Sequence, residues 1–364
     1  MKGKKIYDYT VSGYYGFHNT GDDAVLDVLI REIRVREPGA VIAVITQNEY
    51  PTLKKSGVKF IDRRSIPETL TALYHTRTLI FGGGSLLQDV TSRRSLAYYA
   101  LILKAGHCLC DRVHIFSNGI GPLGIAGEKT VSRLLSSADS VSVRDPFSFC
   151  EAVRMGADPA SVTLGADPVF LMERDAGGEK LLSDFGIGGK FFAVSLRSFS
   201  ESEDFSQIIV FCEKMKKKGL LPLFFPMQES ADGEICRRAA KACGGAVFSG
   251  KSAGEILSVL SLAEFSVGMR LHFLLLSLMA EKPTVALSYD VKIDSTVPYA
   301  GGEFVLPAKA SAHEIESAVS KAEKSTDGEF LRRRCMEMRS LAKRDMDGIL
   351  RPHTLVKTLY SKSV

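Results

Sequence analysis

The chain has 364 residues, with 47 lysines and arginines against 42 aspartates and glutamates, so its formal net charge is +5. Apolar residues make up 45% and charged residues 24% of the sequence, which excludes a disordered or fibrous chain. The length suits two domains of ordinary size, and so small a net charge does not require a nucleic-acid partner.

The sequence shows no export or membrane signal. It begins MKGKK and passes directly into IYDYTV, without the apolar core of a secretory signal. The most apolar stretch, Leu271 to Ala280, reaches about half of a membrane span. The seven cysteines form no CxxC pair and no zinc-ligand spacing, which favours free thiols and no bound metal. We therefore expect a cytoplasmic protein.

Short β-rich runs alternate with amphipathic stretches through the first half of the chain. One helical pattern covers residues 24–36 and ends before Pro38-Gly39. This alternation predicts a mostly parallel sheet with helices on both faces. The predicted strands cover residues 6–11, 41–46, 59–62, 79–81, 113–116, 141–143 and 162–164.

The alternation stops at a stretch rich in glycine, aspartate and glutamate and then starts again. We expect two doubly wound, Rossmann-like α/β domains that face each other across a cleft, with a helical tail. The predicted organisation is a first domain over 1–172, a linker over 173–190, a second domain over 191–345, and a helix over 346–364 that could pack back on the first domain. The strands predicted in the second domain cover residues 191–196, 220–225, 246–248, 265–267 and 284–288.

Loops that follow the predicted strands hold the first candidate site residues, because ligands of open α/β sheets bind at the carboxyl ends of the strands. Gly13, Gly16 and Gly21 do not have GxGxxG spacing, which disfavours a dinucleotide site. The run Gly82 to Gly84 favours a backbone that faces an anion or a sugar, although a close strand crossing would also need glycine. The candidates in these loops are Gly16, Asn19, Gly21, Asp22, Gly83, Gly84, Ser85, Gln88, Asp89, Asn118 and Gly119.

Four cationic or titratable side chains are predicted to converge on the cleft. Arg270 and His272 lie at the start of an apolar helix, where backbone donors and the helix dipole favour an anion. Lys292 follows the next strand, and Arg144 ends a strand beside Asp145, with a local ion pair as the alternative reading. A guanidinium binds carboxylate or phosphate bidentately, so the set predicts a small, multiply anionic ligand.

Seven sequence motifs follow one another along the chain. They are GYYGFHNTGDDAVL (Gly13 to Leu26), GGGSLLQD (Gly82 to Asp89), SNGIGP (Ser117 to Pro122), SVRD (Ser142 to Asp145), ADP (Ala166 to Pro168), MRLH (Met269 to His272) and SYDVK (Ser288 to Lys292). In this order the motifs resemble the polysaccharide pyruvyl transferase family, most closely its bacterial CsaB-like subgroup, which modifies secondary cell-wall polysaccharide and serves S-layer anchoring. The chain departs from the family pattern at His18, Asp23 and Val291, where glycine, glutamate and proline are more usual.

The resemblance implies a glycosyltransferase-B-like fold and phosphoenolpyruvate as the donor, with no cofactor. The product would be a pyruvate ketal on a sugar, with release of phosphate. The acceptor would be an N-acetylmannosamine-containing, lipid-diphosphate-linked saccharide at the cytoplasmic face of the membrane. The donor-binding residues of the family fall on Arg144, His272 and Lys292, and an acceptor-binding arginine falls on Arg63 or Arg64, of which we prefer Arg63.

The chemistry of such a donor suggests roles for these residues. Protonation of its methylene carbon makes the neighbouring carbon electrophilic, so that one sugar hydroxyl adds, phosphate leaves and a second hydroxyl closes the ketal. Arg144 and Lys292 would stabilise the departing charge, and His272 would serve in acid–base chemistry or phosphate binding. Asp145, Asp167 and Asp290 remain alternatives for the base.

Two other functions are compatible with the same pattern: a nucleotide-sugar glycosyltransferase on this fold, and a non-catalytic protein that binds sugars or anions. The carboxy-terminal run from residue 332 to residue 364 holds nine lysines and arginines and three acidic residues. That run is either a solvated helical face or a weak electrostatic contact with an anionic membrane.

Overall fold

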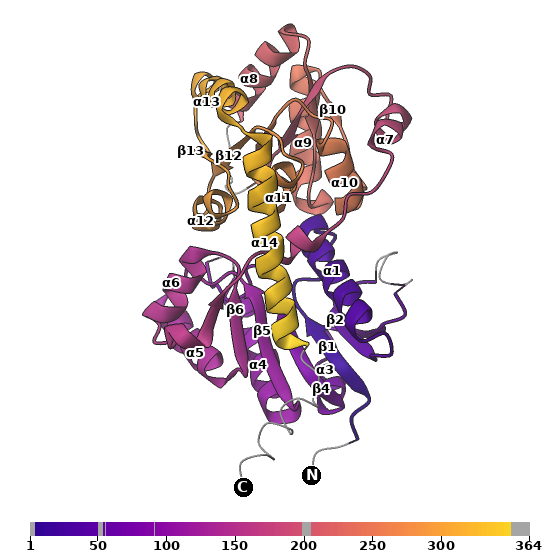
Figure 1. Cartoon of the computed structure of the whole chain (residues 1–364), viewed down its shortest axis with the longest axis vertical. Coiled ribbons are helices and arrows are strands. Elements are labelled where there is room, and N and C mark those ends of the chain that lie inside the picture. Colours follow the sequence, from indigo (N-terminus) through magenta and orange to yellow (C-terminus); the bar gives the residue numbers. More distant parts are fainter. Residues whose placement is uncertain (1–3, 50–53, 55, 91, 199–204, 351–364) are drawn as a thin grey trace.

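The computed structural model describes residues 4–49, 54, 56–90, 92–198 and 205–350, and it contains two parallel sheets, each covered on both faces by helices (Figure 1). Within these residues the amino-terminal sheet has seven strands in the order β3-β2-β1-β4-β5-β6-β7. The predicted fold class of two Rossmann-like domains is confirmed. The strands of this sheet are β1 (Tyr7–Ser12), β2 (Ile42–Thr46), β3 (Lys59–Asp62), β4 (Thr76–Gly82), β5 (Arg112–Asn118), β6 (Ser140–Val143) and β7 (Val162–Leu164).

Four of the main helices of the first domain begin at polar residues that cap them, whereas α5 follows Gly124 without a side-chain cap. The side chains of Asn19, Ser65, Ser92 and Asp145 each accept a hydrogen bond from a backbone N–H of the first helical turn. The main helices are α1 (Thr20–Arg36), α3 (Ile66–Tyr74), α4 (Arg93–Leu109), α5 (Ile125–Ser137) and α6 (Pro146–Arg154).

The described part of the second domain has a six-stranded sheet in the order β10-β9-β8-β11-β12-β13. Sequence patterns did not predict β13 (Phe304–Pro307), which is a half-exposed edge strand that ends in proline and so lacks the apolar run of a buried strand. The other strands are β8 (Phe191–Ser195), β9 (Leu221–Phe224), β10 (Ala246–Val247), β11 (Ser266–Gly268) and β12 (Thr284–Ser288). The helices are α8 (Ser206–Lys217), α9 (Glu229–Cys243), α10 (Ala253–Leu260), α11 (Leu271–Met279), α12 (Val291–Tyr299) and α13 (Ala312–Ser325).

A long helix, α14 (Gly328–Ile349), runs from the second domain down along the first (Figure 1). Near its end the Arg344 side chain donates a hydrogen bond to the carbonyl oxygen of Leu164 at 2.7 Å, and Asp347 pairs with Arg36 of α1 at 2.8 Å. The helix therefore begins well before the predicted residue 346. The last part of the basic run, residues 351–364, lies outside the described residues.

The two domains share one continuous apolar core at their junction. It joins Leu26 of α1, Phe170 of the short 3-10 helix Pro168–Leu171, Leu274 of α11 and Met346 of α14. The predicted linker contains a further helix, α7 (Gly178–Asp184). Because α1 and α11 are both anchored in this core, their amino-terminal ends are held against each other. No helix among the described residues is long and apolar enough to cross a membrane.

Candidate functional site

A cavity of about 340 Å³ lies between the domains, where loops follow the strands of both sheets. We call it the cationic cavity. It brings together most of the residues that the sequence singled out, although they come from five different strand-to-helix segments. Its walls include the predicted residues Asn19, Asp22, Gly84, Ser85, Gln88, Arg144, Arg270, His272 and Lys292.

Several helices begin at this cavity. Asn19 caps α1, Ser92 caps α4, Arg270 precedes α11, and Lys292 lies in the first turn of α12. Unpaired backbone N–H groups and the positive end of each helix dipole therefore face the same space. This arrangement favours an anionic ligand independently of the side-chain charges.

Arg144 is buried in the wall of the cavity and held by two partners. Its Nη1 donates to Asp167 Oδ2 at 3.0 Å, and its Nη2 donates to Ser85 Oγ at 2.7 Å. Its Nε lies 3.8 Å from Asp145 Oδ2 and has no hydrogen-bond partner among the described residues. A guanidinium with this fixed orientation presents a charge and donors to the cavity without side-chain reorganisation.

His272 stands where the two domains meet. A Cβ on Gly21 would lie only 2.0 Å from its Nδ1, so only glycine lets the imidazole pack on the first turn of α1. Its Nε2 lies 3.5 Å from Asp167 Oδ2. Burial alone would raise the pKa of Asp167, but His272 and Arg144 outweigh it and hold this pKa well below its usual range. Asp167 is therefore an ionised anchor for both side chains.

Two further cations have carboxylate partners from their own domain. Arg270 donates from Nε and Nη2 to the buried Asp232, at 2.8 and 2.5 Å. Lys292 Nζ lies 2.9 Å from Asp290 Oδ2, and burial lowers the pKa of this lysine despite that partner. Arg270 is thus a fixed bidentate pair, whereas Lys292 combines a single partner with a desolvated amine.

Asp22 places a carboxyl group on the same cavity, in the first turn of α1. The Asn19 side-chain amide donates to its Oδ2 at 2.5 Å, and burial raises its pKa although His272 and Arg144 oppose that shift. A carboxyl group with a raised pKa beside an anion site can carry a proton to a ligand.

Arg197 and Tyr289 line the cavity but were not among the predicted site residues. The Arg197 side chain donates to the Tyr289 hydroxyl at 2.6 Å, and its guanidinium lies 5.0 Å from the centre of that ring. Arg197 follows β8 as Arg144 follows β6. The expectation that ligands bind at the carboxyl ends of the strands, which identified Arg144, would therefore also have identified Arg197.

Several predicted residues shape the loops and do not line the cavity. Asp145 caps α6, accepting from the Ser148 N–H at 2.9 Å, so the structure gives this proposed catalytic residue a structural contact. Two other predicted side chains also make contacts within the loops: Asp89 accepts a hydrogen bond from the Gly124 N–H at 3.0 Å, and Asn118 donates one to the Phe81 carbonyl at 3.1 Å. Three predicted glycines lie close to side chains of neighbouring segments. Gly16 and Gly83, both with positive φ, pack on Thr46 and Val25, and Gly119 packs on Ser85.

Arg63 lies behind the cavity in a group of aromatic rings. Its guanidinium carbon is 4.9 Å from the Phe17 ring, 4.4 Å from Tyr98 and 5.6 Å from Tyr99, which lines the cavity. Arg64 instead pairs with Asp62 on the surface at 3.0 Å. The local geometry therefore favours Arg63 over Arg64 as the arginine next to the site.

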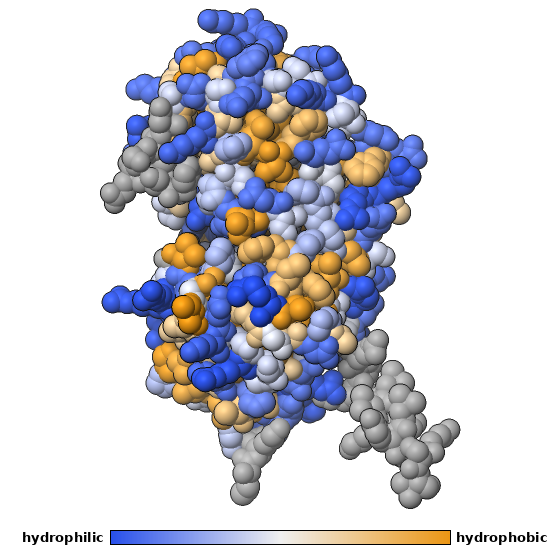
Figure 2. Space-filling model, turned by 90° about the vertical axis from the view of Figure 1, so that its left-hand side faces the viewer, coloured by the Kyte–Doolittle hydropathy of each residue, from blue (hydrophilic) through white to orange (hydrophobic). Residues whose placement is uncertain are grey.

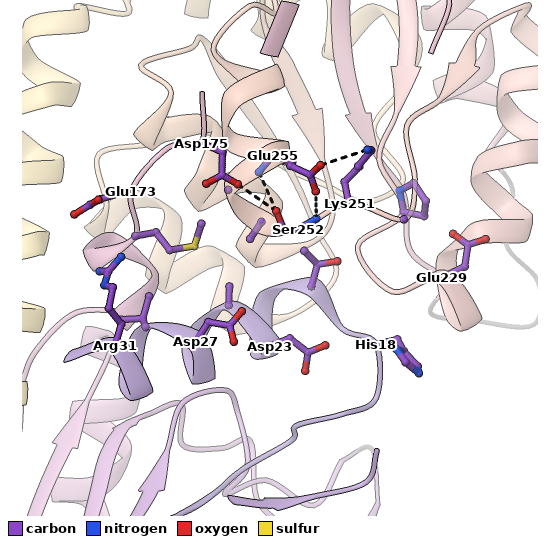
Figure 3. A pocket seen from close by; sticks show the side chains of 18 residues that line it. His18, Asp23, Asp27, Arg31, Glu173, Asp175, Glu229, Lys251, Ser252 and Glu255 are labelled. Carbon is purple, nitrogen blue, oxygen red and sulfur yellow. Dashed lines mark hydrogen bonds and ion pairs between the residues drawn. The ribbon is translucent and has the colours of Figure 1, made fainter. Parts of the chain in front are cut away.

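A second cavity, of about 830 Å³, lies between the same domains on the other side of the β1–α1 loop. We call it the acidic cavity. In Figure 3, Asp23 and Asp27 of α1 lie on one side of this cavity, and the segment that carries Lys251, Ser252 and Glu255 lies on the other. Contacts from Asn19 to Gln228 and from the Thr20 N–H to the Met227 carbonyl, at 2.9 Å, separate it from the cationic cavity.

Solved structures with this architecture place the chain in a fold class. A putative UDP-N-acetylglucosamine 2-epimerase from Listeria monocytogenes has a TM-score of 0.66 at 9% identity, covering 99% of this chain and 98% of that one. Anabaena HepE in complex with UDP and glucose has a TM-score of 0.59 at 10% identity, covering 98% and 100%. WaaG, a glycosyltransferase of lipopolysaccharide biosynthesis, has a TM-score of 0.58 at 12% identity, covering 94% and 100%. The fold is thus of the glycosyltransferase-B type.

Within this fold class the sequence decides the family. Residues 19–291 match the model of the polysaccharide pyruvyl transferase family, and the chain belongs to that family. It is therefore a transferase, and the family supports polysaccharide pyruvylation in general. A comparison with curated protein sequences gives no significant match.

Proposed function

We propose that the cationic cavity binds phosphoenolpyruvate and that the enzyme transfers its enolpyruvyl group to a sugar as a pyruvate ketal, with release of phosphate. One observation carries this proposal: Arg144, Lys292 and His272 converge with several helix amino termini on one cavity of about 340 Å³. A small donor with one phosphate and one carboxylate matches both the size and the charge of that space.

The two anionic groups of the donor would contact different side chains. Arg144 is held rigidly by Asp167 and Ser85, so it suits the planar carboxylate in a bidentate contact. Lys292, in the first turn of α12, and Arg197, in the loop after β8, belong to the second domain and suit the phosphate, whose charge grows as it leaves. Arg270 already donates two hydrogen bonds to Asp232. It would therefore add positive charge to the donor site without a second bidentate contact to the ligand.

Asp22 is our candidate for the proton donor. Its carboxyl group would protonate the methylene carbon of the donor, which becomes a methyl group, and the neighbouring carbon then bonds to a first sugar hydroxyl oxygen. His272 would accept the proton that this hydroxyl loses. Cleavage of the carbon–oxygen bond to phosphate releases inorganic phosphate, which takes the proton held by His272, and the oxygen of a second hydroxyl then bonds to the same carbon to close the ketal. Its proton returns the Asp22 carboxyl to its starting state.

The acceptor would enter beside the aromatic side of the cavity. Tyr14, Tyr99 and Gln88 line it there, and tyrosine rings with polar neighbours suit the apolar and hydroxyl faces of a sugar. We propose an N-acetylmannosamine-containing, lipid-diphosphate-linked acceptor of the CsaB-like type, which would place the enzyme at the inner face of the cell membrane.

Ligand binding and turnover test this proposal in separate steps. Thermal stabilisation is measured with phosphoenolpyruvate and, separately, with UDP-sugars; we expect the first to stabilise the protein. Phosphate release is then followed with a synthetic N-acetylmannosaminyl lipid-diphosphate acceptor. We expect Asp22→Asn and His272→Gln each to lower it about 10²- to 10⁴-fold. Stabilisation by UDP-sugars alone would instead indicate the glycosyltransferase alternative, and full turnover by both variants would contradict the site.

A further inference from the structure

The neighbouring helices α4 and α5 present an unusual outer surface. Five exposed basic residues lie on them, and none of the five has an ion-pair partner in the described part of the chain: Arg93, Arg94, Lys104, Lys129 and Arg133. Helix α4 contains no acidic residue, and the single acidic residue of α5, Glu128, pairs with Arg154 at 2.7 Å. We call this surface the α4/α5 face.

The basic residues form stripes with exposed apolar ones. On α4, Arg94, Ala97, Leu101 and Lys104 follow each other at intervals of three or four residues, so they lie on one side of the helix. On α5, Ile125, Lys129 and Arg133 do the same. Large apolar side chains stand out here, with exposed fractions of 71% for Val90, 44% for Leu101 and 78% for Ile125. Figure 2 views the side on which α5 lies and shows hydrophobic patches among strongly hydrophilic side chains on the first domain.

Other basic surfaces of the molecule differ from this one. On α8, Lys214 and Lys218 both pair with Glu316 of α13, and on α14 Arg332 pairs with Glu281. These two surfaces therefore compensate part of their charge within the chain. The α4/α5 face leaves its positive charges uncompensated, which leaves them available to an external anionic partner.

The position of the face connects it to the cationic cavity. Val90 lies in the loop between Gln88 and Ser92, both of which line that cavity. The Gly124 N–H donates to Asp89 at 3.0 Å and ties the start of α5 to the same loop. A flat partner that contacted Val90 and Ile125 would thus lie at the edge of the site.

We propose that the α4/α5 face binds the surface of an anionic lipid bilayer. Lysines and arginines attract acidic headgroups, while isolated aliphatic side chains enter the interfacial region, and this combination distinguishes a membrane contact from a soluble polyanion site. The inference deepens the proposed function, because it brings the cavity to the surface where a lipid-linked acceptor would lie. It needs no residue of the basic tail.

The test is vesicle cosedimentation of the full chain without donor or acceptor, so its outcome does not depend on the proposed reaction. We expect binding to phosphatidylglycerol vesicles and none to phosphatidylcholine vesicles. The variant Lys104→Glu/Lys129→Glu/Arg133→Glu should weaken binding by roughly fivefold or more for each changed residue. The variant Leu101→Ser/Ile125→Ser should weaken it by about tenfold, because burial of apolar side chains contributes as well.

The matched control reverses three exposed lysines of the second domain, Lys241→Glu/Lys309→Glu/Lys321→Glu, with the same change in net charge. It should retain binding within about threefold. Equal loss in both triple variants would overturn the proposal, because net charge alone would then act. Binding to dextran sulfate with unchanged vesicle binding in the apolar variant would also overturn it, in favour of a soluble polyanion. Phosphate release with a water-soluble acceptor sugar, measured in parallel, reports the proposed reaction independently.

Discussion

Two cavities lie at the same domain junction and differ in almost every property except their shared wall. The acidic cavity is the larger, at about 830 Å³ against about 340 Å³ for the cationic cavity. Neighbouring residues at the start of α1 face opposite sides, because Asn19 and Asp22 line the cationic cavity whereas Thr20 and Asp23 line the acidic one. Size alone would favour the acidic cavity, whereas we propose the cationic cavity as the site because helix termini and buried charges converge on it.

The difference extends to how charges are held. In the cationic cavity Arg144 and Arg270 are buried against Asp167 and Asp232. In the acidic cavity, by contrast, Lys251 and Glu255 form a partly exposed pair at 3.3 Å. The electrostatic field of buried, fixed charges acts strongly on a ligand because the surrounding protein has a low dielectric constant, whereas water screens the charges of exposed pairs. The following substitutions change one cavity and use the other as the control.

The largest effect is expected from Asp232→Asn on α9. Removing this carboxylate leaves Arg270 buried without its bidentate partner, which should lower the free energy of unfolding by about 3–5 kcal/mol. Urea denaturation measures the change. The control is Glu229→Gln on the same helix, whose carboxylate pairs with the exposed Arg237 and lines the acidic cavity. It should cost less than about 0.5 kcal/mol, and similar losses in both variants would contradict the comparison.

Lys292→Met should remove the lysine charge from the cationic cavity. We expect phosphoenolpyruvate-dependent phosphate release to fall about 10²- to 10³-fold, because departing phosphate loses its charge partner. The change is measured as kcat/KM in a coupled phosphate assay. Lys251→Met removes a lysine from the acidic cavity and should change kcat/KM less than about twofold. The opposite ranking would move the reaction to the larger cavity.

Gly21→Ala tests the contact between α1 and His272. The added Cβ would lie 2.0 Å from Nδ1, so the imidazole must move and turnover should fall roughly 10- to 100-fold. Gly254→Ala on α10 is the matched change beside the acidic cavity. Its Cβ would meet the exposed carboxylate of Asp175 at 2.5 Å, and that flexible side chain can rotate away. Turnover of Gly254→Ala should therefore stay unchanged, and a loss equal to that of Gly21→Ala would argue against the His272 contact.

The smallest effect concerns pH and compares two aspartates. Burial raises the pKa of Asp23 to about 7, whereas the pKa of Asp167 is lowered. Because folded Asp23 holds its proton to higher pH than the unfolded chain does, stability falls as pH rises from about 4 to about 7. Asp167 has the opposite sign, since its stabilising effect is present above its unfolded pKa and is lost only in stronger acid.

Asp23→Asn removes the cost of ionising Asp23 and should make the protein about 1–2 kcal/mol more stable at pH 8. The gain should vanish near pH 4, where the carboxyl is protonated in both states. Urea unfolding at pH 8, 6 and 4 gives the profile. A gain that grows towards low pH would show that Asp23 is ionised and stabilising in the folded protein.

Local patterns predicted most of the architecture. Parallel strands that are buried on both faces read as continuous apolar runs, and β2 (Ile42–Thr46) and β8 (Phe191–Ser195) are buried throughout, as that pattern requires. The edge strand β13 escaped prediction because its residues are half-exposed and it ends in proline. The predicted carboxy-terminal segment 346–364 overlaps only the end of α14 (Gly328–Ile349), because this helix is continuous across the domain junction and its sequence shows no break there.

The sequence by itself was enough to predict a site for an anionic ligand. Its loops place arginine, histidine and lysine after strands and before helices, and in open α/β folds such positions meet at one edge of the sheet. The same patterns could not tell a cavity side chain from a capping one. Asp22 and Asp145 have similar positions near helix starts, yet Asp22 lines the cavity and Asp145 caps α6.

Only the tertiary structure decided which residues share a space. Gly21 and His272 are separated by most of the chain, and their contact exists because α1 and α11 are both packed into one interdomain core. The same packing sets a single loop between the cationic and acidic cavities. The sequence specifies which side chains are charged. Their burial and their ion-pair partners depend on contacts between distant segments, and burial and partners set the pKa of each group and its strength of interaction with a ligand.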